Sequence, residues 1–395
     1  KGFRALWAEP LLFHSLTGIR SYVFSAQGVM RLLDRIPGKG EQVRVFEIDI
    51  HKMHSNDWVS ILKRCPNLLS LDLGGKKIGP QVCKVLEKNC SSLVRLCLPT
   101  SITVKHTAEM WTLLKNTPNL RVLKFDHLFM TENLWDKLGM VLFEARGGIP
   151  LLEEMHFCGG GGMPWRALST LGDKLPELKK LTMGTLDPHA FFGASNALRD
   201  PHFRPDPGMV FKPMHRLEEI KIRSIGSGGG SWEPVSTEAL SFFLEKLLAA
   251  VPNIRVLKVL HGTLETKDRA IPALPDLNGV FTRCPPLLHL EELELGNMNV
   301  TVDDFASPFS APKLQVLKLC QCGPSAPAAA QAFFEDKLEV FSIRPRRCFG
   351  SCGCEPIHQC THDMFVQPAS LTDAVKVRHQ DEECVKDLLN MCSMY

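Results

Sequence analysis

The sequence lacks the features that mark several large classes of protein. It has 2 tyrosines against 22 phenylalanines, which favours aromatic rings packed inside the molecule over an aromatic belt on its surface. No apolar run approaches the roughly 18 residues that a membrane-spanning helix requires. The net charge is only +3, so the chain lacks the basic excess typical of proteins that bind nucleic acid or a membrane surface. We therefore expect no nucleic-acid partner and no membrane partner.

Catalytic and phosphate-binding motifs are also missing. The glycine-rich segments GGKKIG (74–79) and GGGG (159–162) do not have the G-x-x-x-x-G-K-[ST] form that cradles a nucleotide phosphate. There is no H-E-x-x-H zinc motif and no G-x-S-x-G nucleophile elbow. A Cys–His pair assembled in space would leave no such motif and stays a distant alternative. The sequence thus predicts a protein that is not an enzyme and has no cofactor.

Composition and cysteine usage indicate a folded protein from a reducing compartment. Apolar residues make up 44% and charged residues 23% of the 395 residues, which excludes wholesale disorder. Most of the 14 cysteines stand singly among apolar residues, as Cys65, Cys83 and Cys97 do. We expect them to be buried free thiols, and the location to be cytoplasmic or nuclear. Because the chain begins with Lys1, we expect it to be a fragment or a processed form.

An internal repeat organises most of the chain. Its form is apolar-x-x-apolar-x-apolar, and the distance between successive first anchors is between 24 and 39 residues. Alternate apolar residues in each copy predict a short strand with one buried face. The clearest copies are CPNLLSLDL (65–73), CSSLVRLCL (90–98), TPNLRVLKF (117–125), LPELKKLTM (175–183), VPNIRVLKV (251–259) and APKLQVLKL (311–319). Five weaker copies bring the total to about eleven.

Helical patterns separate these strands. Apolar residues recur three or four positions apart in 58–65, 81–90, 108–117, 133–145 and 237–251. A strand-plus-helix unit cannot bury its apolar face alone, whereas stacked units can. We therefore predict an α/β leucine-rich-repeat solenoid, a horseshoe with parallel strands on the concave face and helices on the convex face. The solenoid would span 41–345, with long insertions at 184–213, 223–236 and 260–288.

The turns between helix and strand add a resemblance to a known family. Several helical segments end in a CP, TP, LP or VP turn, which uses Pro66, Pro118, Pro176 or Pro252 to stop the helix. The first residues, KGFRALWAEPLLFHSL, resemble the closing turn of an F-box. Together these features resemble fungal F-box proteins with leucine-rich repeats, although most of the F-box is missing. The residues that match its end are Phe3, Trp7, Pro10, Leu11 and Leu12.

The resemblance implies a function as well as a fold. It implies a substrate-recognition subunit of a cullin-type (SCF) ubiquitin ligase, whose repeats bind a protein substrate. A Skp-family adaptor and a cullin would be partners if the full F-box lies upstream. Residues 1–40 would then be the end of the F-box followed by a capping helix. The alternatives are that this region is only a cap, and that the repeats form an interaction scaffold unrelated to ubiquitin.

The concave face is where we expect a partner to bind. Strand positions between the buried anchors point to this face. They are acidic in the first repeats and mainly basic in the central ones, so the central section would suit an acidic or phosphorylated segment. A solvated face with no preferred ligand is the alternative. The candidate binding residues are Lys124, His156, Lys180, Lys221, Arg223 and Lys258.

The last part of the chain, 346–395, is expected to hold a Cys/His-rich loop and a C-terminal capping helix. Cys348, Cys352, Cys354 and Cys360 lie close together with His358 and His362, a composition that can form a tetrahedral zinc site. Their spacing matches no common zinc module. A surface loop with free thiols is therefore the first expectation, and a metal site the alternative.

Overall fold

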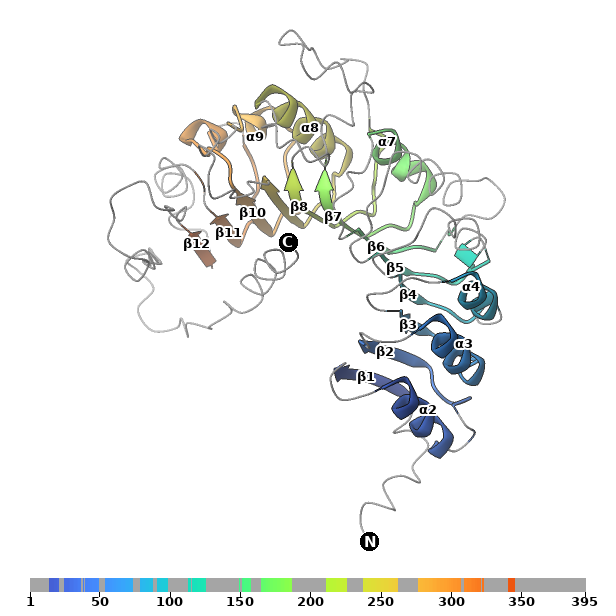
Figure 1. Cartoon of the computed structure of the whole chain (residues 1–395). Coiled ribbons are helices and arrows are strands. Elements are labelled where there is room, and N and C mark those ends of the chain that lie inside the picture. The colour runs from blue at the N-terminus through green and yellow to red at the C-terminus, as the bar shows by residue number, and fades with distance from the viewer. Residues whose placement is uncertain are drawn as a thin grey trace, which may run out of the picture.

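The computed structural model is built around one continuous parallel β-sheet. The structure describes residues 14–20, 25–36, 38, 40–49, 54–73, 79–87, 91–98, 113–114, 116–125, 149, 151–157, 165–186, 211–225, 237–261, 276–306, 309–320, 322 and 340–344. Within these residues, twelve strands lie side by side in chain order, and each pairs in parallel with the next. They line the inner side of an arc whose outer side carries the helices (Figure 1). The predicted leucine-rich-repeat solenoid is therefore confirmed.

The strands are short, and most span four to seven residues. Their bounds are β1 Ser15–Arg20, β2 Val45–Asp49, β3 Ser70–Asp72, β4 Arg95–Leu98, β5 Val122–Phe125 and β6 Glu154–Phe157. The series continues with β7 Lys180–Leu186, β8 Glu219–Ile225, β9 Val256–His261, β10 Glu292–Gly296, β11 Val316–Cys320 and β12 Val340–Arg344. Strands β2 to β12 coincide with the eleven copies of the sequence repeat.

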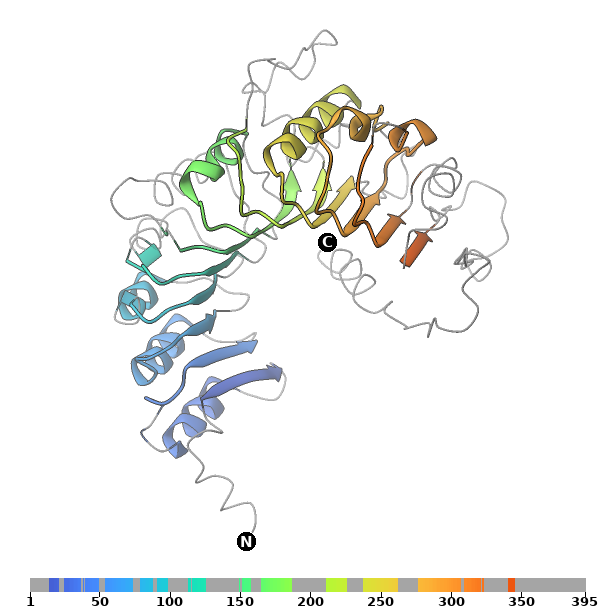
Figure 2. The same ribbon diagram turned by 180° about the vertical axis from the view of Figure 1, so that it is seen from behind.

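Helices on the convex side cover the sheet, as the view from behind also shows (Figure 2). They are α2 Ala26–Arg35, α3 Ser55–Arg64, α4 Pro80–Leu86, α7 Trp165–Lys174, α8 Thr237–Ala250, α9 Val280–Arg283 and the 3-10 helix η6 Val302–Asp304. Helices α3, α4 and α8 confirm three of the helical patterns. Of the pattern at 108–117 only residues 113–114 are described as helical, and 133–145 lies outside the described residues. In the part of the chain that the structure describes, no helix is both long and apolar enough to cross a membrane.

The repeat anchors form the core between the sheet and the helices. In β5, for example, Leu123 and Phe125 are buried whereas Val122 and Lys124 are half-buried. The Phe125 ring stacks on Phe157 of the next strand, with centroids 5.0 Å apart. A fully buried leucine or phenylalanine contributes roughly 1.5–3 kcal/mol of hydrophobic stabilisation. The same inner positions are filled in repeat after repeat, so the core is one continuous layer along the solenoid.

Hydrogen bonds at the strand entrances hold successive repeats in register. The carbonyl of Arg44 accepts from the N–H groups of both Leu69 (2.7 Å) and Ser70 (3.0 Å), and the same pattern recurs up to β11. The asparagine of each P-N turn adds a side-chain bond to the preceding repeat. The Nδ2 atoms of Asn67, Asn119 and Asn253 donate to the backbone carbonyls of Glu41 (3.1 Å), Ser91 (2.6 Å) and His215 (2.7 Å). The turn motif thus ties each unit to the one before it.

The first strand, β1, differs from the expectation for the N-terminal region. Residues 1–40 were expected to hold an F-box end and a capping helix, and no strand was predicted there. The structure places α2 at Ala26–Arg35 but also pairs β1 with β2, with Ser15, Leu16 and Thr17 opposite Val45, Phe46 and Glu47. The segment SLTGIR has only part of the anchor pattern, which is why the sequence did not reveal it. The array therefore starts one strand earlier than the sequence repeats do.

Candidate protein-binding surface

The concave surface is built by side chains that alternate with the buried anchors. We call the first outward position of each strand the first row and the second outward position the middle row. Because the strands pair in register, residues of one row are neighbours about 4.8 Å apart across the sheet. From β5 to β11 the middle row reads Lys124, His156, Thr182, Lys221, Lys258, Glu294 and Lys318.

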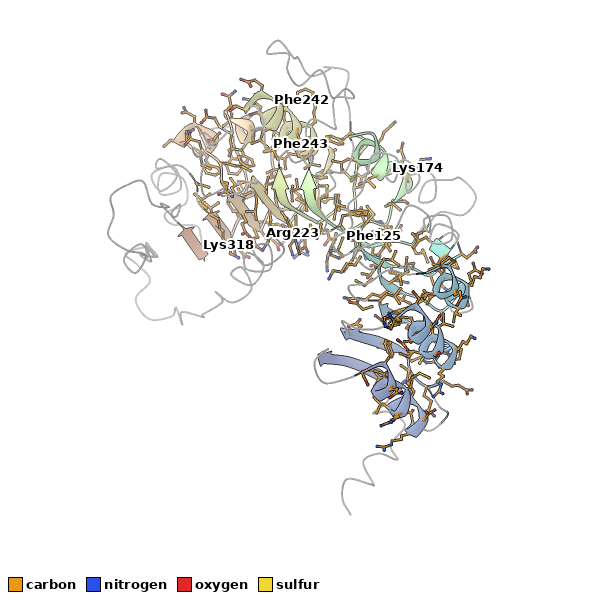
Figure 3. The ribbon with its side chains drawn as sticks, viewed as in Figure 1. Phe125, Lys174, Arg223, Phe242, Phe243 and Lys318 are labelled. Atoms are coloured by element: carbon orange, nitrogen blue, oxygen red, sulfur yellow. The ribbon has the colours of Figure 1, made fainter. Side chains whose placement is uncertain are left out.

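All six candidate binding residues lie on this surface. Lys124, His156, Lys221 and Lys258 belong to the middle row, and Lys180 belongs to the first row. Arg223 is the next outward position of β8 after Lys221. Figure 3 labels Arg223 and Lys318 on the inner side of the arc. The structure thus places the candidates on one face, and which ligand they bind stays a proposal.

Carboxylates that alternate with these lysines change the charge of the surface. Lys180 Nζ lies 2.8 Å from Glu154 Oε1 of the neighbouring strand. Lys221 Nζ lies 2.5 Å from Glu219 Oε1, two residues earlier on the same face of β8. Sequence reasoning missed this compensation because it weighed the middle row most heavily, whereas Glu154 and Glu219 occupy the first row. The central section is therefore a mixed surface with a smaller positive excess than expected.

At the C-terminal end of the concave surface, on β9 to β11, the described lysines and glutamates balance each other in charge. Lys258 Nζ contacts Glu292 Oε1 at 2.8 Å and Glu294 Oε2 at 3.3 Å, and Lys318 Nζ donates to Glu292 Oε1 at 3.0 Å. Burial lowers the pKa of Lys258, but Glu292 and Glu294 outweigh it and the net pKa is raised. Burial likewise raises the pKa of Glu292, and the two lysines reverse the shift so that its pKa is lowered. Lys258 and Glu292 therefore stay ionised at neutral pH. Together with Glu294 and Lys318 they form a C-terminal charge cluster that links β9, β10 and β11.

His156 is the centre of a separate polar group. Its Nδ1 lies 2.9 Å from Thr182 Oγ1, and its Nε2 lies 3.5 Å from Glu154 Oε2. Burial lowers the pKa of His156, with Lys124 and Lys221 lowering it further and Glu154 opposing them. A neutral ring fits this geometry, with Nδ1 accepting from the threonine hydroxyl and Nε2–H directed toward the carboxylate. The imidazole therefore adds no charge to the central section at neutral pH.

The lowered pKa of His156 predicts a pH-dependent stability. Its pKa in the folded state lies below the ordinary 6.5, so the unfolded chain binds more protons just below that value. The wild type should therefore lose stability as the pH falls below about 6.5, the ordinary value for a free histidine. His156→Gln removes the titration, so its melting temperature should fall less between pH 7 and pH 5. Melting curves recorded by circular dichroism at both pH values test this, and parallel losses in the two proteins would contradict it.

A second series of ion pairs lies just ahead of the strands. Glu153 contacts both Arg121 (2.6 Å) and Lys179 (2.9 Å), and Arg255 pairs with Glu291 through Nη2 at 2.9 Å. Hydrogen bonds from Lys179 are the main cause of the lowered pKa of Glu153, against a smaller effect of burial. These side chains are partly exposed to solvent, so each pair adds little stability. Their regular spacing makes the entrance edge of the sheet a mixed-charge border to the concave surface.

The cysteines of the described residues behave as core side chains. Cys65, Cys83 and Cys97 are buried, and these and the other described cysteines are free thiols. Burial raises the pKa of Cys65, Cys284 and Cys322 to about 12. Such thiols are protonated at neutral pH and are poor nucleophiles. Cys90 and Cys158, which also stand singly in the sequence, lie outside the described residues.

Several predicted features lie outside the part of the chain that the structure describes. These are the F-box-like residues Phe3, Trp7, Pro10, Leu11 and Leu12, the cysteines Cys348, Cys352, Cys354 and Cys360, and the C-terminal capping helix. Most of the three insertions also falls outside it. Residues 276–288, which the sequence assigned to the third insertion, contain α9 and a bridge between Asp276 and Asn299. Among the described residues, no group of His, Cys, Asp and Glu has a geometry that could hold a metal ion.

Comparisons with known proteins found matches to solved structures, but none to a protein family or a curated sequence. A crystal structure of a TLR13–ssRNA13 complex matches at 16% identity and a TM-score of 0.33, covering 70% of this chain and 38% of that one. A crystal structure of the yeast Rad7–Elc1 complex matches at 15% identity and a TM-score of 0.35, covering 88% and 70%. Neither similarity is high enough to indicate a function for this chain.

Proposed function

We propose that the chain recognises a protein partner on its concave surface, and that it does so as the substrate-binding subunit of an SCF-type ubiquitin ligase. The observation that carries the binding role is the ordered row of half-buried polar side chains on a continuous sheet. His156, Lys221 and Lys258 are each held by neighbours on the sheet. A partner would therefore meet side chains that are already positioned, which lowers the entropic cost of binding.

The ubiquitin-ligase role has a separate support, namely the sequence resemblance of the repeats and of residues 3–12 to F-box proteins. In that role the chain supplies recognition, and the other subunits transfer ubiquitin, so no residue here acts as a catalyst. The alternative is an interaction scaffold without a ligase. The mixed-charge concave surface supports protein binding in both cases.

A pull-down from the native cells tests both parts of the proposal. The open reading frame that encodes this chain is tagged and expressed with and without any segment encoded upstream of Lys1, and bound proteins are identified by mass spectrometry. We expect a Skp-family adaptor and a cullin only with that segment, and other partners with both forms. Stable partners without adaptor or cullin in either form would support the scaffold. Recovery of no partner by either form would contradict the binding role.

A further inference from the structure

The positive excess of the concave surface lies over its central strands. From β5 to β8, four described cations face two described carboxylates, Glu154 and Glu219. From β9 to β11, two lysines face two glutamates, which they neutralise. On β2 to β4, Glu47 and Asp72 face Arg95, so this end has the opposite sign. The four central cations are Lys124, Lys180, Lys221 and Arg223.

The four cations differ in whether they have an ion-pair partner among the described residues. Lys180 and Lys221 are engaged by Glu154 and Glu219. Lys124 and Arg223 have no carboxylate within ion-pair distance among the described residues. Both side chains are half-buried. Such groups gain more from an incoming anion than fully exposed lysines do.

We propose that Lys124 and Arg223 anchor two anionic side chains of an extended acidic segment in the protein partner. This inference rests on the proposed binding function and names the class of ligand. Strands β5 and β8 are three spacings apart, about 14 Å, and Arg223 is two residues, about 7 Å, beyond Lys221 along β8. The backbones of the two anchors are therefore about 16 Å apart.

An extended peptide matches this separation at one spacing. Four residues of extended chain span about 13.6 Å, and side chains at positions i and i+4 point to the same side. The remaining gap is within reach of the long lysine and arginine side chains. The expected motif is an acidic residue, three intervening residues and a second acidic residue. The segment would cross the strands above His156 and Thr182, whose polar atoms are paired with each other.

The same surface is less suited to single-stranded nucleic acid. Glu154 and Glu219 lie in the first row, beside the path that joins the two anchors, and reduce the positive charge available to a continuous row of phosphates. Stacking platforms for bases need exposed aromatic rings. The outward positions of the described strands β2 to β11 carry no phenylalanine, tyrosine or tryptophan. A peptide with two separate charges needs only the two anchors, whereas an RNA backbone needs cations along its whole path.

Binding of synthetic peptides to the full chain tests the proposal. The probe is a fluorescein-labelled 13-residue peptide of Gly, Ser and Thr that carries Glu at two positions four apart, and binding is followed by anisotropy. Lys124→Gln combined with Arg223→Gln should raise the Kd about tenfold, since two charge pairs at half-buried positions are lost. Binding to the wild type should weaken as NaCl rises. Lys63→Gln combined with Lys84→Gln, on the exposed side of α3 and α4, removes the same charge and should leave the Kd unchanged.

Further peptides show whether the anchors prefer a carboxylate or a phosphate group, and whether the spacing of the two charges matters. A phosphoserine pair in place of the glutamates reports whether the anchors prefer phosphate, which carries more charge per group. A Gln pair and a Glu pair two positions apart should bind at least several-fold more weakly. Lys124→Glu combined with Arg223→Glu should reverse the preference, so that a peptide with Lys at the same two positions binds better than the Glu peptide. Melting curves confirm that each variant is folded.

Defined results would overturn the inference. They are no saturable binding of either anionic peptide, equal binding of the Gln peptide, equal loss in the Lys63/Lys84 control, or tighter binding of a 12-nucleotide oligouridine that Lys124→Gln with Arg223→Gln abolishes. The cellular pull-down separates this failure from failure of the proposed function. If the double variant recovers the same partners as the wild type, the acidic-segment inference is wrong and the binding function stands. If the wild type recovers no partner, the binding function itself is wrong.

Discussion

Replacing Asp304 by alanine should destabilise the C-terminal half of the solenoid by about 2–3 kcal/mol. Its carboxylate is fully buried and accepts three hydrogen bonds. Oδ1 accepts from the backbone N–H of Gly279 at 2.7 Å, and Oδ2 accepts from the N–H and the hydroxyl of Thr301 at 2.8 and 3.1 Å. Alanine would leave these donors without a partner inside the protein, where unsatisfied polar groups are most costly.

The position of Asp304 explains why the effect should be large. Gly279 and the preceding Asn278 have φ values of +69° and +54°, so the chain enters α9 through two residues in the left-handed region. Asp304, at the end of η6, fixes this turn from the neighbouring repeat. Beneath it the rings of Phe281 and Phe305 stack with centroids 5.8 Å apart. Loss of the carboxylate would loosen the turn and the aromatic contact together.

Denaturant unfolding compared across three variants tests this prediction. Asp303→Ala is the matched control, because Asp303 is the adjacent carboxylate and is exposed, so its loss should change the free energy of unfolding by less than about 0.5 kcal/mol. Asp304→Asn keeps one acceptor oxygen and should fall between the wild type and Asp304→Ala. Equal effects at positions 303 and 304 would show that the buried hydrogen bonds do not stabilise this region.

Much of the fold was readable from the sequence because one pattern is repeated. The inner anchors of the clear copies, such as Leu123 and Leu257, are buried in the structure. A period-2 pattern assigns each residue to a face, and its repetition fixes the register of neighbouring strands. Segments without a repeated signal were missed. The strand β1 has only part of the anchor pattern, and α9 spans four residues, too few for a helical period to show.

The sequence predicted where the candidate surface lies, but it was a poorer guide to the net charge of that surface. The rule that outward positions alternate with anchors located Lys124, His156 and Lys258 correctly on the concave face. Their electrostatic environment depends on the side chains opposite them in the neighbouring strands. Glu292 is an example, since it meets Lys258 on one side and Lys318 on the other. Only the register of three strands reveals that this group of charges is balanced. Lys124 and Arg223, in contrast, have no carboxylate at ion-pair distance in the part of the chain that the structure describes.

A close approach of two backbone segments gives the second large expected effect, at Gly172 of α7. A methyl group added at this position would lie 2.4 Å from the carbonyl oxygen of Pro213 and 2.9 Å from that of Lys212. The segment 211–214 is itself anchored, because Phe211 and Met214 are buried and the Met214 N–H donates to the Ala250 carbonyl at 2.8 Å. Neither the helix nor this segment can move without breaking packed contacts.

Gly172→Ala should therefore lower the free energy of unfolding by about 2–3 kcal/mol, as overpacking of a close-packed interior does. The sign of this change in the free energy of unfolding is informative, because a glycine-to-alanine substitution inside a helix ordinarily stabilises a protein by up to about 1 kcal/mol.

Gly296→Ala is the matched control. A methyl group there would lie 2.4 Å from Leu260 Cδ2, the end of a flexible side chain that can rotate away, and 3.3 Å from the backbone oxygen of Cys320, a contact that a small shift relieves. We expect a loss below about 1 kcal/mol at Gly296 by denaturant unfolding, since its closest contact is a side chain that can yield, whereas at Gly172 the closest contact is a backbone carbonyl. A stabilised Gly172→Ala variant would mean that α7 and the segment 211–214 are not held in contact, and that the convex layer tolerates displacement between β7 and β8.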